Sequence, residues 1–541
     1  MARLLKCAGP AIVLAALVLV PFFGKAFTID DTLFLRQAQQ ITIDPSHPTA
    51  FDIVWTEKPA PLRMSEIMVS GPAMAYLLVP TIWAHGAEWV AHATQLLLLI
   101  AAILGTVTLG FRLGASDRDA TIAALLLAAT PASLAMASSA MPDIAAMAFG
   151  VIGLERLLAW RETRRWSAGL GATAALAAGA LARSHVLLLL PVGVVLLLWT
   201  PATAGRTKTA ARPTGRLWIP VALVPIVVAA VSFLLQDPDG AASVIGATMR
   251  YSGTEQVAAN LAAFATHWAL ALPLALFWML LHGSRVVRQP ALYLAGIAIG
   301  ALVWDPEHVV RASLIAVAGG LSAGVLADVL IDAWRRRDRV QLALGLALFA
   351  AAPVGLYQHL PSKYLLVSAP AAALLLARTA ARRAPLVAWR TAGITVAAGL
   401  VLAVLIIRAD AAFADLGRRA ADDLIATRTA RGQTVWFAGH WGFQWYAERA
   451  GAKPLTLHGP APRPGDLAVS SQNALGAIIE VFQPRTLVTV LASDQPGGRI
   501  MSRAAGAGFY SNVWGYLPWA WSDDVLDRYT LWRLDETITL K

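Results

Sequence analysis

Residues 1–34, MARLLKCAGPAIVLAALVLVPFFGKAFTIDDTLF, combine a basic start, an apolar run over Cys7–Gly24 and two adjacent carboxylates, Asp30 and Asp31. An apolar run of about twenty residues is long enough to cross the hydrocarbon core of a membrane as a helix. A secretory signal peptide begins in the same way, but the best small-residue cleavage site here, Gly24-Lys25-Ala26, is a poor one. We therefore expect a retained first membrane span that leads directly into an acidic loop.

The composition of the whole chain extends this expectation to a polytopic membrane protein. Of the 541 residues, 57% are hydrophobic and only 14% are charged, and the mean hydropathy is +0.60. A soluble chain of this length exposes far more charge. The net charge of +11 does not indicate nucleic-acid binding, because the basic residues lie between apolar runs and form no stripe interleaved with aromatic residues. Without a Walker A motif or a glycine-rich dinucleotide loop, nothing supports a nucleotide-driven pump.

Thirteen apolar runs predict about thirteen membrane-spanning helices in an all-α domain over residues 1–408. A soluble α/β domain over residues 409–541 follows. Boundaries follow the runs of apolar residues and the turn residues between them. The predicted spans are 8–24, 89–112, 119–138, 142–160, 167–183, 185–200, 217–235, 264–282, 291–304, 312–333, 341–357, 364–380 and 391–408.

Basic residues sort the loops between these spans into two sets. The short loops on one side are rich in Arg and Lys, whereas the longer loops on the other side hold few basic residues. Cytoplasmic loops carry this excess of positive charge, so the N-terminus is predicted to be cytoplasmic and the tail periplasmic, in a bacterial cytoplasmic membrane. The basic set comprises Arg3, Lys6, Arg112, Arg118, Arg161, Arg164, Arg165, Arg206, Lys208, Arg212, Arg216, Arg285, Arg288, Arg335, Arg336, Arg337, Arg339, Arg382, Arg383 and Arg390.

Two regions are predicted to lie outside the membrane on the far side from the cytoplasm. The first is the loop 25–88, in which the apolar stretch Gly71–His85 is expected to form an interfacial helix in the membrane plane. The second is the tail, whose periodicity and turn residues predict mixed α/β structure. Its elements are predicted as strands at 434–438, 466–470 and 486–491 and a helix at 443–450.

Three carboxylates at this same predicted surface are candidates for chemistry. Asp30 and Asp31 follow the first span, and Asp143 begins the fourth span after Pro142. A carboxylate beside a low-dielectric layer is costly unless it is paired or titrated, and one placed there can act as a general base on a hydroxyl. The alternative is structural, because an acidic residue at a helix N-terminus also caps the helix and complements its dipole. Spacing alone leaves both interpretations open.

Basic groups lie at the same predicted surface. Arg183 and His185 form the turn before the sixth span, and Lys363-Tyr364 opens the twelfth. Such a cluster can hold a lipid-linked phosphate through charge-assisted hydrogen bonds, although basic side chains at an interface commonly just extend into the water-facing headgroup layer. The histidines show no metal-ligand spacing, so a metal site is undetermined and a divalent ion held by scattered Asp and His stays an option.

The order and sidedness of these motifs resemble the GT-C glycosyltransferase superfamily, in particular bacterial relatives of protein O-mannosyltransferases and of lipid A aminoarabinose transferase. An acidic pair opens the first outer loop, an interfacial helix closes it, and an acidic residue begins the fourth span. A basic outer turn, a basic–Tyr–Leu–Leu opening of a late span and a soluble outer domain complete the layout. The matching segments are Asp30-Asp31, 71–78, Pro142-Asp143, 183–187 and 363–366, and Glu57-Lys58-Pro59 resembles a Glu-Lys-Pro of the aminoarabinose branch.

The resemblance implies a polyprenyl-phosphate sugar as donor, with undecaprenyl phosphate as the bacterial carrier, and a lipid, glycan or protein as acceptor. It implies that Asp30 is the base and that Asp31 and Asp143 support it or bind a divalent ion. Donor-phosphate binding is expected from Arg183, His185, Lys363, Tyr364 and Lys58. Ser70-Gly71-Pro72 stands where the family often has His-Pro-Pro. His92 stands about where the family commonly has an Arg near the start of span two. These differences leave the donor sugar and the acceptor open.

Two rival functions use the same layout. A secondary transporter or lipid-linked sugar flippase normally places polar groups at mid-membrane between related halves, and this sequence shows neither feature clearly. A non-catalytic scaffold whose tail binds glycans is the other rival. Fold alone does not decide among these functions.

Overall fold

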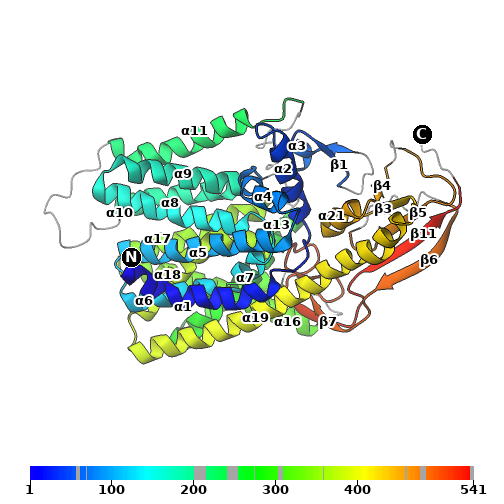
Figure 1. Cartoon of the computed structure of the whole chain (residues 1–541). Helices are drawn as coiled ribbons and strands as arrows, with labels where there is room; N and C mark the ends of the chain where they lie inside the picture. The colour runs from blue at the N-terminus through cyan, green and yellow to red at the C-terminus, as the bar shows by residue number, and fades with distance from the viewer. Residues whose placement is uncertain are drawn as a thin grey trace.

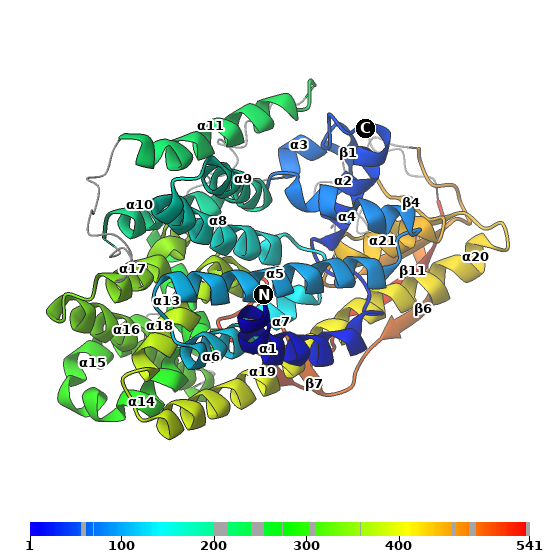
Figure 2. The same ribbon diagram turned by 60° about the vertical axis from the view of Figure 1, so that its left-hand side comes forward.

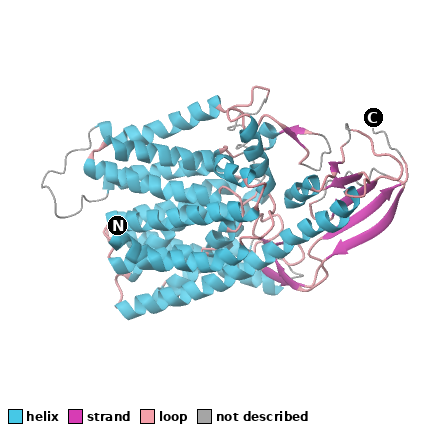
Figure 3. Ribbon diagram, in the orientation of Figure 1, coloured by secondary structure: helices cyan, strands magenta, loops and turns pink. Residues whose placement is uncertain are grey.

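The computed structural model describes residues 1–55, 61–68, 70–199, 215–239, 254–272, 274–301, 309–357, 359–456, 460–474 and 483–536. A bundle of long helices carries a strand-containing region at one end (Figures 1 and 3). We call this end of the bundle the domain end. The opposite end, where the N-terminus lies, we call the basic end.

Most of the helices run between these two ends, with apolar side chains facing one another in a continuous core. Helices α14, α15 and α16 pack together on one flank (Figure 2). The bundle helices are α1 (Ala2–Leu19), α5 (Glu88–Arg112), α6 (Asp117–Ala128), α7 (Pro131–Ala137), α8 (Asp143–Thr163), α9 (Trp166–Ala182), α10 (Leu189–Trp199), α11 (Ile219–Leu234), α13 (Thr254–Leu270), α14 (Leu274–Arg288), α15 (Pro290–Ala301), α16 (Val309–Arg335), α17 (Arg339–Leu348), α18 (Ala369–Ala380) and α19 (Pro385–Ala420).

The chain is a multi-pass membrane protein by the length and apolarity of these helices. In the described part of the chain, 6 helices are long and apolar enough to cross a membrane, or up to 7 if the bent pair α6 and α7 forms one span. That pair is bent by 57°, because Pro131 begins α7 and cannot continue the hydrogen bonding of α6. Several other predicted spans are represented by shorter helices, so the expected count of thirteen is not confirmed.

Two further predicted spans differ from the observed helices in their ends. The run 264–282 is not one helix, because α13 ends at Leu270 and α14 begins at Leu274. The sequence has Pro273 between them, a residue that lacks the N–H needed to continue a helix. The run 391–408 is too short, because α19 continues to Ala420 and then through a π-helical turn, Ala421–Ala426. The predicted domain boundary at 408/409 therefore falls inside a helix.

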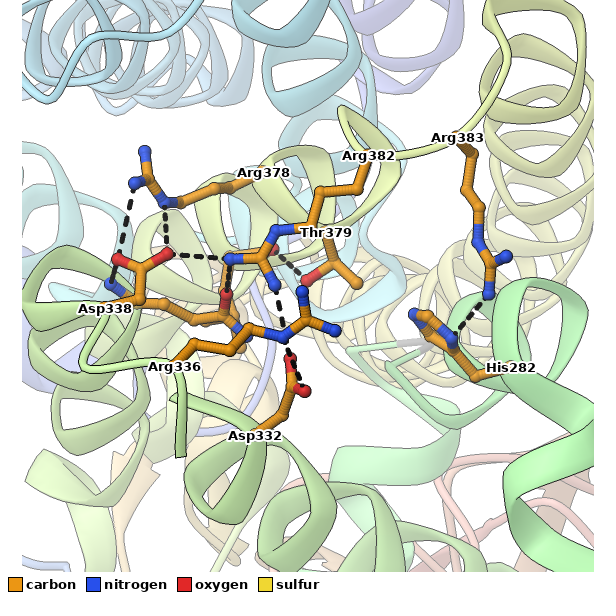
Figure 4. A network of polar contacts seen from close by, with 10 residues as sticks. His282, Asp332, Arg336, Asp338, Arg378, Thr379, Arg382 and Arg383 are labelled. Carbon is orange, nitrogen blue, oxygen red and sulfur yellow. Dashed lines mark hydrogen bonds and ion pairs between the residues drawn. The ribbon is translucent and has the colours of Figure 1, made fainter. Parts of the chain in front are cut away.

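The loops that the charge pattern assigned to one side meet at the basic end. Asp332 and Asp338 lie among arginines there: Arg336 and Arg382 contact Asp332, and Arg378 and Arg382 contact Asp338 (Figure 4). Arg3 pairs with Asp117 at 2.7 Å near the same end. These carboxylates hold neighbouring loops together where arginines would otherwise repel one another. The predicted basic residues of 200–214 lie outside the described residues, and which side of a membrane this end faces stays a prediction.

The region at the domain end is built as the tail pattern predicted. Its main sheet has the strand order β4-β3-β5-β11-β6, in which β3 runs parallel to β4 and β5 while β11 is antiparallel to β5 and β6. All four predicted tail elements are found, within a few residues of their expected bounds. The elements are β3 (Val435–Ala438), α21 (Trp441–Arg449), β4 (Lys453–Pro454), β5 (Leu467–Ser471), β6 (Arg485–Ala492), β7 (Gly497–Arg499), β8 (Met501–Ser502), β9 (Ala507–Gly508), β10 (Ala520–Ser522) and β11 (Arg528–Leu534).

The outer loop lies between the bundle and this C-terminal region (Figure 1). The helix expected at Gly71–His85 is α4, and it packs against α2. Met74, Ala75 and Leu78 of α4 are buried, so its apolar face is used for packing against protein. The loop contains α2 (Asp31–Ile43), β1 (Asp52–Ile53), β2 (Leu62–Arg63), α3 (Met64–Ile67) and α4 (Ala73–Trp83).

Candidate functional site

The site is built around the turn that joins the first helix to α2. Ile29 in this turn has a φ of +40°, a left-handed conformation that is an outlier for a β-branched residue. Such strain persists only where the surrounding structure enforces it, and it is concentrated at functional sites. The turn sends the side chains of Asp30 and Asp31, adjacent in sequence, into different surroundings.

Asp30 faces an ammonium group from the other end of the chain. Its carboxylate lies 3.1 Å from Lys363 Nζ, and 34% of the Asp30 side chain is exposed whereas 3% of Lys363 is. Asp30 is the N-cap residue of α2 but its side chain makes no capping hydrogen bond, so the geometry does not favour the capping interpretation. Burial alone would raise the pKa of Asp30, but the positive charges of Lys363 and Arg183 outweigh it and hold that pKa below its usual value.

Asp31 is completely buried, and its carboxylate accepts hydrogen bonds from the backbone. Its carboxylate accepts hydrogen bonds from the backbone N–H of Thr28 at 2.9 Å and of Ala140 at 2.8 Å. Burial raises the pKa of Asp31 to about 7, and the nearby Lys25 and the two backbone donors only partly oppose this shift. With no exposed surface, Asp31 is placed to hold the turn against the connection between α7 and α8, whereas the Asp30 carboxylate is partly exposed.

A second ion pair, between Asp143 and Arg183, lies beside the first. Arg183 donates from Nε and Nη2 to the two oxygens of Asp143 at 3.1 and 3.0 Å, and from Nη1 to Ser70 Oγ at 2.9 Å. Arg183 is one of the basic residues that the sequence placed at the same predicted surface as Asp143. Asp143 begins α8 without capping it, and its side chain is 1% exposed. Arg183 and Asp143 therefore form a bidentate ion pair that is largely shielded from solvent.

Aromatic rings surround the two cations. Arg183 Cζ lies 5.2 Å from the ring centroid of Tyr364, and the ring centroids of His185 and Tyr364 lie 5.6 Å apart. Tyr364 follows Lys363 in a short 3-10 helix, Ser362–Ser368. The structure thus brings Asp30, Asp143, Arg183, His185, Lys363 and Tyr364 to one place. Lys363 is buried and Arg183 is 11% exposed, and each pairs with a carboxylate, so neither side chain extends into a headgroup layer. Lys58 lies outside the described residues.

Two further side chains reach this place that the sequence did not single out. His359 and His440 have pKa values lowered to about 4, chiefly by burial, and both experience the negative charge of Asp30. His440 comes from the C-terminal region, and its ring lies 5.4 Å from that of Trp55 in the outer loop. Both histidines are in their neutral form at neutral pH, and a neutral imidazole can donate or accept a hydrogen bond. No local pattern distinguishes them from the other histidines of the chain.

A buried polar layer supports the turn from behind. Lys25 pairs with Asp410 of α19 at 2.7 Å and donates to the carbonyl of Ser138 at 2.8 Å. Asp410 also accepts hydrogen bonds from Tyr510 Oη at 2.9 Å and from Thr28 Oγ1 at 3.3 Å. A buried charge pair with every oxygen satisfied specifies one geometry. In the described residues, no three His, Cys, Asp or Glu side chains group as ligands for a metal ion.

No protein-family model and no curated protein matches the chain. Its structure is similar to that of ArnT from Cupriavidus metallidurans bound to undecaprenyl phosphate, at 16% identity and a TM-score of 0.47, covering 89% of this chain and 96% of that one. It is also similar to an oligosaccharyltransferase of Archaeoglobus fulgidus (16%, 0.31, 67% and 53%). A third similar structure is the mycobacterial arabinofuranosyltransferase AftD (14%, 0.39, 97% and 40%).

Each of these similarities is one of fold, at 14–16% identity and with TM-scores below 0.5. At these identities and TM-scores the likeness says nothing about the reaction of this chain. Its function has to be inferred from the site.

Proposed function

We propose that this protein is a membrane glycosyltransferase that moves a sugar from a polyprenyl-phosphate donor, carried by undecaprenyl phosphate, to an acceptor hydroxyl at the membrane surface. The observation that carries the proposal is the ion pair of Asp30 with Lys363. It puts a partly exposed carboxylate beside a buried ammonium group, with a second, arginine-based cation site next to it. A base and phosphate-binding cations side by side are what this transfer requires.

In the proposed reaction, Asp30 accepts the proton of the acceptor hydroxyl as that oxygen attacks the anomeric carbon of the sugar. The bond from the anomeric carbon to the phosphate oxygen breaks, and the phosphate leaves on its lipid carrier. Lys363 is bound to Asp30 at 3.1 Å. A donor phosphate draws the ammonium group toward itself, which removes positive charge from Asp30 and makes it a stronger base.

The leaving phosphate needs positive charge that stays in place. Arg183 is held by Asp143 and Ser70, and its guanidinium still has N–H groups left to donate to a phosphate oxygen. Tyr364 and His185 flank it and complete the proposed donor-phosphate site. Asp143 then acts through Arg183, which it orients, and Asp31 acts through the turn that carries Asp30.

The rest of the assignment follows from the same proposal. Residues 1–408 form the transferase domain and residues 409–541 an extracytoplasmic domain. The N-terminus is cytoplasmic, as the charge pattern predicts, and the site opens to the outer surface of the bacterial cytoplasmic membrane. The acceptor is a lipid, a glycan or a protein of the cell envelope.

The test is the combined analysis of cells that lack the gene and of the purified protein. Loss of the gene should remove one sugar from an envelope lipid, glycan or glycoprotein, as measured by mass spectrometry. The protein in detergent should restore that sugar from an undecaprenyl-phosphate donor. A transporter or flippase needs two separated compartments, so transfer in detergent excludes it. Unchanged lipid, glycan and glycoprotein masses in the deletion strain would overturn the proposal.

A further inference from the structure

The two loops that supply the Asp30–Lys363 pair are each bound to the C-terminal region. The partners are 333 residues apart in sequence, and among the described residues no helix or strand contains both of them. Each loop instead donates backbone or hydroxyl hydrogen bonds to the same strand-containing region. Unpaired buried backbone groups are costly, so these bonds determine where each loop lies.

The loop of Asp30 is bound to α21 on both sides of the carboxylate. The backbone N–H of Phe27 donates to Tyr446 Oη at 2.8 Å, and Tyr446 Oη in turn donates to Glu88 at 3.0 Å. Beyond the carboxylate, Thr32 Oγ1 donates to the carbonyl of Trp441 at 2.7 Å. A Cβ on Gly442 would come within 2.0 Å of the Phe27 carbonyl, so only glycine allows α21 to approach this closely.

The loop of Lys363 is bound to the segment 509–512. The backbone N–H of Leu360 donates to Asn512 Oδ1 at 2.8 Å, and that of Ser362 donates to the carbonyl of Phe509 at 3.1 Å. Asn512 is 5% exposed, and its Nδ2 donates to Asn260 Oδ1 of α13 at 2.9 Å. The ring of Tyr510, between these residues, lies 5.6 Å from Lys363 Nζ.

From these contacts we infer that the C-terminal region is a template that holds Asp30 and Lys363 against each other, with Asn512 and Tyr446 as positioning residues. Each of the two residues acts on one loop only. An effect on catalysis rests on the proposed function. The placement of Asp30 against Lys363 by the C-terminal region does not rest on it. It can therefore be measured without any substrate.

The experiment uses the full chain in detergent with its single cysteine, Cys7, replaced by serine. Asp30→Cys and Lys363→Cys then place two thiols where the ion pair was. Without the attraction of the pair, the loops are held by their hydrogen bonds to the C-terminal region and by the α7–α8 connection, where Ala140 binds Asp31 and Met141 lies against the loop of Lys363. The variants below change the first set of contacts and leave the second intact. The rate of reaction with dibromobimane, which fluoresces when it bridges two thiols, reports how often they are adjacent. Asn512→Ala and Tyr446→Phe are each tested in this background.

Either variant should slow bridging by about fivefold to tenfold, the change in population expected when a buried hydrogen bond is lost. Tyr446→Phe keeps the ring in place, so its effect does not depend on repacking the domain. The matched control is Asn473→Ala: Asn473 donates to the Leu526 carbonyl within the C-terminal region and binds neither loop. Bridging should be unchanged in this control.

Bridging at the parent rate in both variants would overturn the inference, and so would equal slowing in the Asn473→Ala control. With Asp30 and Lys363 restored, the same variants should lower the kcat of sugar transfer more than they raise the KM for donor. Absence of transfer in the parent protein would count against the proposed function only, because the bridging result would stand.

Discussion

Replacing Asp30 with asparagine removes a negative charge and a proton acceptor while it preserves the shape of the side chain. In the structure this carboxylate makes no capping bond, and it pairs with Lys363 at 3.1 Å. An asparagine oxygen can still accept a hydrogen bond from that ammonium group. The effects on stability and on catalysis should therefore differ widely in size.

The stability cost of Asp30→Asn is expected to be small. Lys363 is 3% exposed, but water reaches the Asp30 side chain, which is 34% exposed. Because the asparagine oxygen keeps a hydrogen bond to the ammonium group, the lost charge should cost about 1 kcal/mol. Loss of a general base lowers a rate by about 10²–10⁴-fold, which corresponds to roughly 3–5 kcal/mol of transition-state stabilisation. The expected loss of catalysis thus exceeds the expected loss of stability several times over.

The assay measures transfer from an undecaprenyl-phosphate sugar by mass spectrometry, with thermal unfolding recorded on the same samples. The matched control is Asp44→Asn, at the opposite end of α2, where the carboxylate contacts His47 on the surface. This control should transfer at the parent rate. Transfer by Asp30→Asn within about threefold of the parent, far inside the range for loss of a base, would refute the assignment of Asp30.

Three further predictions concern charge, pH and topology. Lys363→Gln should weaken binding of undecaprenyl phosphate by about tenfold, as titrated by native mass spectrometry, because a charge-assisted hydrogen bond is lost; unchanged affinity would contradict the phosphate-binding role. Because the pKa of Asp31 is raised to about 7 from 3.8, the folded protein binds more protons than the unfolded chain between these values. Stability should therefore fall as pH rises from about 4 to 7, and Asp31→Asn should flatten this slope in thermal unfolding scans. A reporter fused after the last residue should be active only outside the cytoplasm and one in the loop after α16 only inside; both on one side would disprove the predicted sidedness.

The sequence pattern predicted the helical bundle and four elements of the tail because each depends on local periodicity. β11, the fourth of the five strands in the sheet, was not predicted; it carries Arg528 and Arg533 at exposed positions. The run 264–282 was misjudged because apolar residues continue across Pro273. Apolarity sets where a chain enters a membrane, whereas backbone hydrogen bonding sets where a helix stops.

At the site, the charged residues could be predicted from the sequence, but not which of them is buried and which is exposed. Asp30 and Asp31 are adjacent and chemically equal, and only the turn at Ile29 decides which one is enclosed. His440 and Asn512 reach the site through docking of the C-terminal region. Contacts that arise from docking between distant segments leave no local pattern in the sequence, so these residues could not have been found from it.

One uninterrupted helical rod, Pro385–Thr429, connects the bundle to the C-terminal region and is 45 residues long. At about 1.5 Å per residue it measures roughly 65 Å, and each residue turns it by about 100°. Insertion of a single residue near its middle would swing everything beyond it by about a quarter turn and separate Tyr446 from Phe27. Seven inserted residues restore the phase but lift the region by about 10 Å. The number of residues in this rod thus fixes the rotation of the C-terminal region about the helix axis. Length variation among homologous chains should therefore be confined to the loops on either side of the rod.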